Sequence, residues 1–197
     1  MISTNGRAAT AFWIVFAVWG LVEWLPSIRE LASRHQPTDG SADRGTMRHL
    51  MAYVGLAYGV AFLAAYEVPA AAIRPDRTPH FWFGLGVIVA GIPVRQWAVL
   101  TLGRFFTRRL HFQEGQTLVS RGPYRFVRHP SYLGGLISML GLGIALGNWL
   151  ALVAAGGFTI VGYVGRIRVE EAMLRANLGA DYENFSLGRA RLVPGVW

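Results

Sequence analysis

The sequence contains no cysteine and no lysine, and charged residues make up only 15% of its 197 positions. The absence of cysteine excludes disulfide bonds, thiolate zinc sites and cysteine nucleophiles. All 19 basic residues are arginine, a bias typical of a high-GC genome. An average soluble domain has about 25% charged residues. Here 53% of the residues are apolar and the mean hydropathy is +0.34, which argues against both a soluble domain and intrinsic disorder.

The chain contains several long apolar runs. A helix that spans a membrane needs about 20 mostly apolar residues, and three runs of suitable length lie at about Ala8–Pro26, Met47–Ile73 and His80–Leu102. A fourth, uncharged stretch covers Ser131–Gly165 and is too long for one crossing. We interpret it as two short spans joined by a turn at Gly147–Asn148. The sequence therefore predicts an all-α, polytopic membrane protein with five transmembrane helices.

We interpret residues 1–197 as a single membrane-embedded domain. Residues 1–102 form three spans, residues 103–130 a cytoplasmic loop, residues 131–165 a helical hairpin and residues 166–197 a cytoplasmic tail.

The arginines divide unequally between the two sides that five spans create. Fifteen fall on the side of the C-terminus, three on the side of the N-terminus, and Arg95 lies within the third span. Cytoplasmic loops carry an excess of basic residues, so we expect the N-terminus outside and the C-terminus in the cytoplasm of a bacterial inner membrane. The net charge of +8 then reflects membrane topology, and no nucleic-acid partner is expected.

Small residues in the predicted spans favour close helix packing. Gly55 and Gly59 are spaced as GxxxG, as are Gly143 and Gly147. The GLG triplets at residues 84–86 and 141–143 lie inside spans and lack a third glycine at the right spacing, so we interpret them as packing positions, not as a dinucleotide loop. No Walker, HExxH or EF-hand pattern is present, and no metal is expected.

The first polar segment, residues 117–132, contains a turn at Gly122-Pro123 and ends where the fourth span begins. Pro130 suits the start of a helix, which places Arg128 and His129 at a helix N-terminus near the membrane surface. Such a terminus attracts anions. A basic cluster that binds lipid head groups is an equally good interpretation of these residues.

The second polar segment, residues 166–185, continues the last span into the cytoplasm and has a C-cap signal at Gly179. Arg166 and Glu170 are four residues apart and share one helix face. Arg166 is a candidate anion-binding group, with Arg128 next, and Glu170 is a candidate acceptor for an ammonium group. The alternative is an amphipathic surface helix with an ordinary Arg–Glu pair, which stabilises little.

Four elements in this order resemble a known family. They are Gly122-Pro-Tyr, Arg128-His-Pro-Ser-Tyr132-Leu-Gly, Arg166…Glu170-Glu171 and Gly179-x-x-Tyr182. This pattern is similar to that of the isoprenylcysteine carboxyl methyltransferase family, whose broader group includes phospholipid N-methyltransferases and membrane thiol methyltransferases. The resemblance covers about Leu100–Pro194.

The resemblance implies S-adenosylmethionine as cofactor, held in a cytoplasmic pocket by the loop and the last helices. Carried over position by position, Arg166 is the catalytic residue that faces the substrate, and Glu170 meets the amino group of the cofactor. Arg95, a charge within the third span beside the kink at Pro93, either reaches the cytoplasmic interface or helps to shape the acceptor site. His111 is a weaker match to a cofactor-contacting position. The remaining cofactor-binding residues that the resemblance implies are Gln116, Thr117, Leu118, Val119, Tyr124, His129, Pro130, Ser131 and Tyr132.

The resemblance predicts methyl transfer to a lipophilic acceptor, favouring a carboxylate such as that of a prenylcysteine or isoprenoid-like compound. The expected partners are a lipophilic small molecule or lipidated acceptor and membrane lipids. A carboxylate needs no proton removal, so catalysis would rest on proximity, orientation and exclusion of water. A phospholipid amine or a small thiol would need deprotonation, with His129 or Tyr132 as candidate bases. An NADPH-dependent enzyme resembling sterol reductases and a small transporter or scaffold are the remaining alternatives.

Overall fold

The computed structural model describes residues 6–32, 43, 45–73, 78–107, 110–113 and 115–197, and in these residues the chain is all-α, as predicted. Two isolated β-bridges are the only extended pairing in the described part of the chain. The helices are α1 (Gly6–Ala32), α2 (Thr46–Glu67), α3 (Thr78–Leu102), α4 (Pro130–Ala145), α5 (Trp149–Leu178) and α6 (Ala180–Ser186), with short 3-10 turns η2 (Pro69–Ala71), η3 (Gly103–Phe105) and η4 (Gly122–Arg125).

Four of the helices, α1, α2, α3 and α5, are long and apolar enough to cross a membrane. The fourth in chain order, α4, is also apolar but has only 16 residues. The structure therefore has four candidate spans and one shorter apolar helix. That all five cross the membrane stays a prediction.

The first span predicted at about Ala8–Pro26 lies within α1, whose candidate membrane span is Gly6–Glu23 and which continues through Pro26 to Ala32. A proline inside a helix leaves the carbonyl four residues earlier without its usual N–H partner. That carbonyl belongs to Val22, and it accepts a hydrogen bond from Gln96 Nε2 of α3 at 3.5 Å. The neighbouring helix thus compensates for the missing bond, which the sequence of α1 alone did not reveal.

The predicted hairpin at Gly147–Asn148 is confirmed, since α4 ends at Ala145 and α5 begins at Trp149. The fully buried Asn148 side chain caps α5 by accepting from Ala151 N at 3.1 Å. Its Nδ2 donates to the carbonyls of Ala64 at 3.2 Å and Val68 at 2.8 Å. One side chain therefore joins the hairpin to the end of α2.

Glycines of α3 and α4 bring these two helices into backbone contact. A Cβ on Gly84 would lie 2.2 Å from Ala145 N, and one on Gly141 would lie 2.6 Å from Ile88 N. Gly143 approaches α5 in the same way, 2.5 Å from Leu152 Cα. The interpretation of the GLG triplets as packing positions is confirmed for these glycines.

The expected GxxxG contact of Gly55 and Gly59 is wrong. Both glycines are exposed, and a Cβ on either would meet nothing within 4 Å. Helix α2 instead buries a neighbouring stripe of alanines, Ala57, Ala61 and Ala65. The spacing showed that the glycines share a face, but not which face of α2 meets another helix. Gly147, the partner expected for Gly143, forms the interhelical turn with φ 61°.

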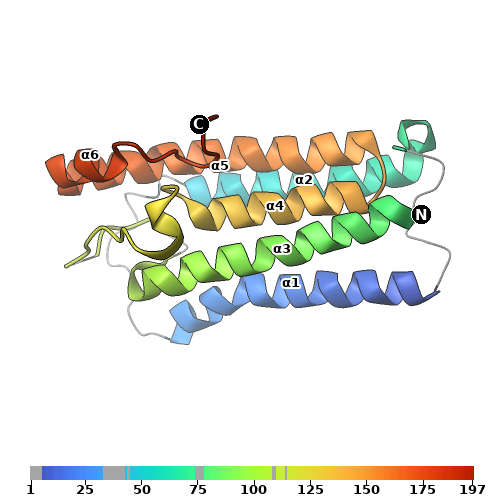
Figure 1. The fold of residues 1–197 in the computed structure, drawn as a ribbon, viewed down its shortest axis with the longest axis horizontal. Coiled ribbons are helices and arrows are strands. Elements are labelled where there is room, and N and C mark those ends of the chain that lie inside the picture. The colour runs from blue at the N-terminus through green and yellow to red at the C-terminus, as the bar shows by residue number, and fades with distance from the viewer. Residues whose placement is uncertain (1–5, 33–42, 44, 74–77, 108–109, 114) are drawn as a thin grey trace.

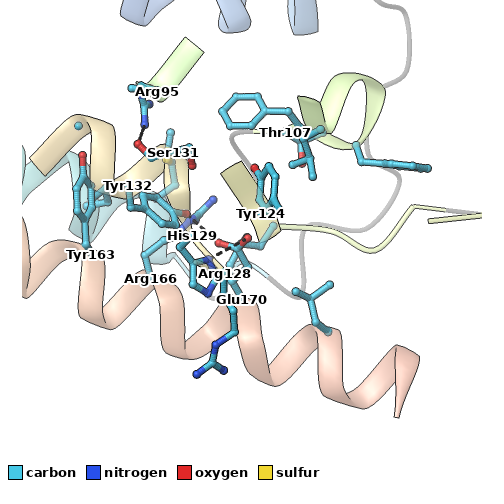
Figure 2. Close-up of a pocket in the computed structure, with 18 of the residues that line it drawn as sticks. Arg95, Thr107, Tyr124, Arg128, His129, Ser131, Tyr132, Tyr163, Arg166 and Glu170 are labelled. Carbon is cyan, nitrogen blue, oxygen red and sulfur yellow. Dashed lines mark hydrogen bonds and ion pairs between the residues drawn. The ribbon is translucent and has the colours of Figure 1, made fainter. Parts of the chain in front are cut away.

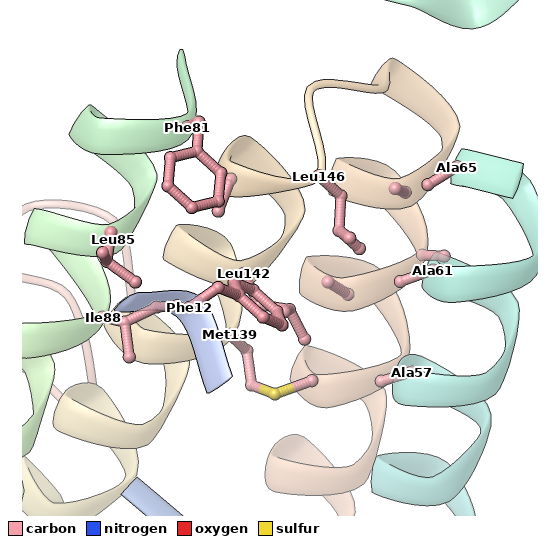
Figure 3. Packing of buried hydrophobic residues seen from close by; sticks show 14 of the residues in the cluster. Phe12, Ala57, Ala61, Ala65, Phe81, Leu85, Ile88, Met139, Leu142 and Leu146 are labelled. Atoms are coloured by element: carbon pink, nitrogen blue, oxygen red, sulfur yellow. The ribbon is translucent and has the colours of Figure 1, made fainter. Parts of the chain in front are cut away.

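The apolar core lies between the helices (Figure 3). It joins α1, α2, α3, α4 and α5 and includes Phe12, Ala61, Leu85, Met139, Leu142 and Ala155. Figure 1 shows the N-terminal end of α1, η2 and the α4–α5 turn at one end of the bundle, and α6 with the end of α3 at the other. The predicted loops thus gather at two opposite ends. Arg34, Arg44, Arg74, Arg77, Arg108 and Arg109, which entered the charge count, lie outside the described residues.

Candidate active site

A cavity of about 320 Å³ opens where the segment between α3 and α4 meets the bundle (Figure 2). Ligand cavities in proteins range from about 300 to 1,000 Å³. All but one of the site residues predicted from the sequence line this cavity, although they come from four separate parts of the chain. These are Arg95, Gln116, Thr117, Leu118, Val119, Tyr124, His129, Ser131, Tyr132, Arg166 and Glu170.

Pro130 is the predicted site residue that does not line the cavity. It is buried and occupies the first position of α4, where its missing N–H costs no helical hydrogen bond. Its role in the structure is to begin the helix directly after His129. The weaker candidate, His111, does line the cavity.

Glu170, Tyr132 and His129 form a polar group at the cavity wall. The Tyr132 hydroxyl donates to Glu170 Oε2 at 2.9 Å, and His129 Nδ1 lies 3.8 Å from Glu170 Oε1. His129 is buried, with 4% of its side chain exposed, whereas 25% of the Glu170 side chain is exposed. Glu170 therefore presents a carboxylate held from one side and accessible from the other.

Arg166 lies one turn before Glu170 on the same face of α5, as the spacing predicts. Its guanidinium Nη1 forms an ion pair with Asp43 and donates to Thr46 Oγ1 at 2.7 Å. Only 2% of the Arg166 side chain is exposed. Burial of a charge is costly unless it is paired, and this pair comes from the segment that begins α2.

Arg95 forms the second ion pair of the cavity, with Glu23 of α1. Its Nη1 also donates to the carbonyl oxygen of Ser131 at 2.9 Å, at the beginning of α4. Arg95 thus links α1, α3 and α4 at the cavity wall. Charged residues within spans are expected to pair in this way and to face the interior of the bundle.

Glu171, next to Glu170, is almost completely buried and binds four basic side chains. Arg128 lies 2.8 Å away, Arg191 3.0 Å, Arg175 3.3 Å and the His129 ring 3.4 Å. Arg128 also lines the cavity and forms an ion pair with Glu171, and its role toward a ligand anion stays a prediction. Glu171 fixes the orientation of His129, and so acts on the site from behind the cavity wall.

The C-terminal segment folds back onto the bundle and does not extend away from it as a tail. The amides of Arg128 and His129 donate to the carbonyls of Ala190 and Arg191 at 2.9 and 3.0 Å. Leu192 is buried, and Trp197 packs beside it against the cluster formed by α4 and α5. Figure 1 accordingly places the C-terminus alongside α5. The segment completes the support of the loop that carries His129.

The elements around the cavity contribute different side chains. The segment between α3 and α4 and helix α6 contribute polar and aromatic groups that include Gln116, Tyr124 and Tyr182. Helices α1, α2 and α4 contribute apolar groups that include Trp19 and Met139, and the rings of Trp19 and Tyr58 lie 5.8 Å apart. One cavity therefore combines polar and apolar lining.

Tyr124 is a neutral group in this site. Burial and the nearby charge of Glu170 raise the pKa of the Tyr124 hydroxyl above its ordinary value. Its hydroxyl therefore stays protonated at physiological pH and acts as a hydrogen-bond donor. Burial and the charge of Glu171 likewise raise the pKa of Tyr182 to about 12.

The acidic partners of the two cavity arginines, Glu23 and Asp43, are not among the site residues predicted from the sequence. The available signal for Glu23 is its position near the end of the first predicted span, at the same end of the bundle as Arg95, because oppositely charged residues at one depth tend to pair. Asp43 lies outside the predicted spans and 123 residues from Arg166, so no local signal indicates their pairing.

The part of the chain that contains most of the cavity residues is similar to known proteins. Residues 79–181 match the model of the family described as "Phospholipid methyltransferase". A rice protein (Oryza sativa subsp. indica) named "Probable protein-S-isoprenylcysteine O-methyltransferase" is 38% identical over 116 residues, which cover 54% of this chain and 59% of the rice protein. Protein-S-isoprenylcysteine O-methyltransferase A of Arabidopsis thaliana is 35% identical over 127 residues, covering 62% of this chain and 64% of the plant protein.

A solved structure is similar as well. It is that of a eukaryotic intramembrane Ras methyltransferase, isoprenylcysteine carboxyl methyltransferase, with a TM-score of 0.59 and 26% sequence identity. The similarity covers 74% of this chain and 52% of that one. The chain thus spans about three fifths of the length of the plant relatives it matches, and about half of the solved chain.

Proposed function

The chain belongs to the phospholipid methyltransferase family and is similar in sequence to isoprenylcysteine carboxyl methyltransferases, so we propose that it is an integral-membrane methyltransferase. The reaction we propose is transfer of a methyl group from S-adenosylmethionine to a lipophilic carboxylate, such as that of a prenylcysteine. The observation that carries the proposal is a single cavity lined by Glu170, by Arg95 and Arg166, and by both polar and apolar side chains. The side formed by the α3–α4 segment and α6 is the polar end that we assign to the cofactor, and the side formed by α1, α2 and α4 is the apolar end that we assign to the acceptor.

The polar end has the groups that S-adenosylmethionine requires. When bound, this cofactor supplies a methyl group activated by a sulfonium charge. The partly exposed Glu170 carboxylate is placed to accept from an ammonium group. His129 caps α4 without a side-chain hydrogen bond to the helix, and the amides of the first helical turn attract a carboxylate. Gln116, Thr117, Leu118, Val119, Tyr124, Ser131 and Tyr132 would form the rest of the cofactor site.

The middle of the cavity suits an anionic acceptor. Arg166 is the residue that we propose orients the acceptor carboxylate, and Arg95 shapes the wall opposite it. A guanidinium can hold a carboxylate with two parallel hydrogen bonds, which fixes both position and orientation. A carboxylate is ionised at neutral pH, so no residue has to remove a proton. This agrees with the neutral state of Tyr124.

The apolar end would receive the lipid part of the acceptor. Trp19, Met51, Val54 and Met139 offer it a dry surface among the membrane helices. The similar proteins are named for isoprenylcysteine substrates, so a lipidated peptide or protein is the partner class that we propose. The family description also names phospholipids, and an amine of a phospholipid head group is the competing acceptor.

The decisive experiment offers several acceptors to purified protein in lipid nanodiscs with methyl-labelled S-adenosylmethionine. We expect label on N-acetyl-S-farnesylcysteine, as a base-labile methyl ester, and little on phosphatidylethanolamine or a long-chain thiol. Arg166→Ala and Glu170→Ala should each abolish transfer, whereas Glu183→Gln, which changes an exposed carboxylate paired with Arg175, should not. Binding of NADPH in place of S-adenosylmethionine, or label only on the phospholipid amine, would refute the proposed reaction.

We also propose that the N-terminus lies outside and the cofactor end of the cavity in the cytoplasm, where S-adenosylmethionine is made available to enzymes. The excess of arginine on the C-terminal side supports this orientation. Reporter fusions at the two termini in a bacterial inner membrane test it, and activity of a periplasmic reporter at the C-terminus would contradict it.

A further inference from the structure

The beginning of α2 holds Arg166 through a small, well-bonded group. The Thr46 hydroxyl donates to Asp43 Oδ1 at 2.8 Å, and Arg166 Nη1 bonds to both residues. The side chain of Asp43 is 13% exposed and that of Arg166 is 2% exposed. This Asp43–Thr46–Arg166 triad joins the N-terminal half of the chain to the site carried by α5.

Asp43 is itself firmly placed. Although burial opposes its ionisation, the hydrogen bond from Thr46 and the charge of Arg166 hold the pKa of the Asp43 carboxyl below its ordinary value. A carboxylate at the N-terminal end of a helix also interacts favourably with the helix dipole. The triad is therefore an ionised, preorganised contact. Asp43 is bound by both Thr46 and Arg166, so we expect it to stay in place when an acceptor carboxylate binds.

Helix α2 is a rigid support for this contact, because it packs against α5. A Cβ on Gly162 of α5 would lie 3.1 Å from Tyr53 Cβ and 3.2 Å from Leu50 Cδ1, which shows how closely the two helices approach. Gly162 lies one turn before Arg166. Asp43, three residues before α2, and Arg166 of α5 are thus joined near the point where the two helices pack closely.

We propose that Asp43, assisted by Thr46, is a positioning residue that fixes the guanidinium of Arg166 for the acceptor carboxylate. This inference rests on the proposed function, in which Arg166 orients the acceptor. An arginine side chain has several rotatable bonds, and holding one end of its guanidinium sets the plane in which the other donors lie. Accurate orientation of the acceptor is what the proposed reaction requires.

The triad predicts that a change at Asp43 affects the acceptor and not the cofactor. Arg166 acts on the acceptor, whereas Glu170, one turn later, is assigned to the cofactor and is held by Tyr132. Loss of the Asp43 carboxylate should therefore weaken use of the acceptor and leave cofactor binding unchanged. A residue needed only for folding would change both together.

The test compares Asp43→Asn, Asp43→Glu and Thr46→Val with the wild type in nanodiscs. Glu183→Gln is the matched control, because it also removes a carboxylate paired with an arginine but lies at an exposed site outside the cavity. For each protein we would measure kcat and KM for N-acetyl-S-farnesylcysteine, the Kd of S-adenosylmethionine, and the thermal midpoint. Binding of the farnesylated compound without turnover would be followed by quenching of tryptophan fluorescence, since Trp19 lines the cavity.

We expect Asp43→Asn to raise the KM and Kd of the acceptor at least tenfold, with the Kd of S-adenosylmethionine within twofold of wild type. Asp43→Glu, which keeps the charge, should recover part of the loss, and Thr46→Val should show a smaller defect of the same kind. Unchanged acceptor affinity in Asp43→Asn would overturn the inference. So would equal weakening of both ligands together with a lower thermal midpoint.

The outcomes also separate this inference from the proposed function. If the wild type binds the farnesylated compound with Asp43-dependent affinity but transfers no methyl group, the positioning role stands and the proposed reaction fails. If the wild type and Asp43→Asn bind and methylate equally well, the reaction stands and the positioning role fails. If the wild type does not bind the compound at all, both fail.

Discussion

At Gly134, both the packing of α3 against α4 and the geometry of the site depend on the absence of a Cβ. It lies near the beginning of α4, against the backbone of α3 at Arg95. A Cβ at this position would be 2.5 Å from Arg95 N and 2.8 Å from its Cα and Cβ. Backbone atoms cannot rotate away as a side chain can, and ordinary contacts begin near 3.4 Å. Gly134→Ala therefore requires the two helices to separate by about 1 Å.

That separation would act directly on the candidate acceptor site. The bond from Arg95 Nη1 to the Ser131 carbonyl is 2.9 Å long and joins the same two helices. The next residue, Tyr132, holds Glu170. A misplacement of about 1 Å can cost about 100-fold in rate, and strain in a packed interface costs about 1–3 kcal/mol. We expect kcat/KM for the acceptor to fall about 100-fold, with a lower thermal midpoint.

The assay is methyl transfer to N-acetyl-S-farnesylcysteine by matched preparations of wild type, Gly134→Ala and Gly165→Ala. Gly165 precedes Arg166 in α5, but a Cβ there would meet nothing within 4 Å. The control therefore adds the same methyl group beside a site residue without forcing helices apart. Gly134→Ala with more than a third of wild-type kcat/KM, or Gly165→Ala with an equal loss, would refute the reasoning.

Three further predictions follow from single side chains. Glu171→Gln leaves the half-buried positive charges of Arg128 and Arg191 without their counter-ion, so we expect a loss of about 3–5 kcal/mol in unfolding free energy, measured by denaturation in detergent. Asn148→Ala removes the α5 cap and the partner of two α2 carbonyls, and should lower the thermal midpoint by several degrees, unlike Asn177→Ala on the exposed surface. The depressed pKa of Asp43 means that its ionised form stabilises the fold above pH 3.8 and that this contribution is lost as pH falls through the lower folded-state pKa. The difference in thermal midpoint between wild type and Asp43→Asn should therefore shrink on acidification below pH 3.8, and a constant difference would contradict it.

Features that are set by a few neighbouring residues could be predicted from the sequence. The turn at Gly147–Asn148 follows from a charge-free stretch too long for one crossing, and Gly179 ends α5 as a C-cap should. Pro130 begins α4 because proline is favoured at a first helical position. The cavity residues between 116 and 132 followed from family motifs, which record what a local segment does in many related chains.

Features that depend on which helix lies opposite could not be predicted. Gly55 and Gly59 share a face of α2 that no described helix covers closely. Gln96 of α3 supplies a donor to the Val22 carbonyl that Pro26 leaves without its usual partner. Glu171 is the ionic partner of Arg128. Sequence periodicity gives the face of a residue and its charge, whereas its partner is set by packing between distant segments.

The N-terminal half is more than a hydrophobic anchor for the half that carries the family motifs. A buried arginine in a membrane protein is costly unless a counter-charge is held beside it. Both cavity arginines pair with acids of the N-terminal half, Arg95 with Glu23 of α1 and Arg166 with Asp43, which lies just before α2. Helices α1 and α2 also contribute Trp19 and Tyr58 to the cavity wall, so we expect a change in that wall to shift an arginine as well. Trp19→Ala should therefore alter both the preferred chain length of the acceptor and the rate at which its carboxylate is methylated. A series of S-alkylated N-acetylcysteines of increasing chain length measures both effects, and a change in chain-length preference at an unchanged maximal rate would contradict this coupling.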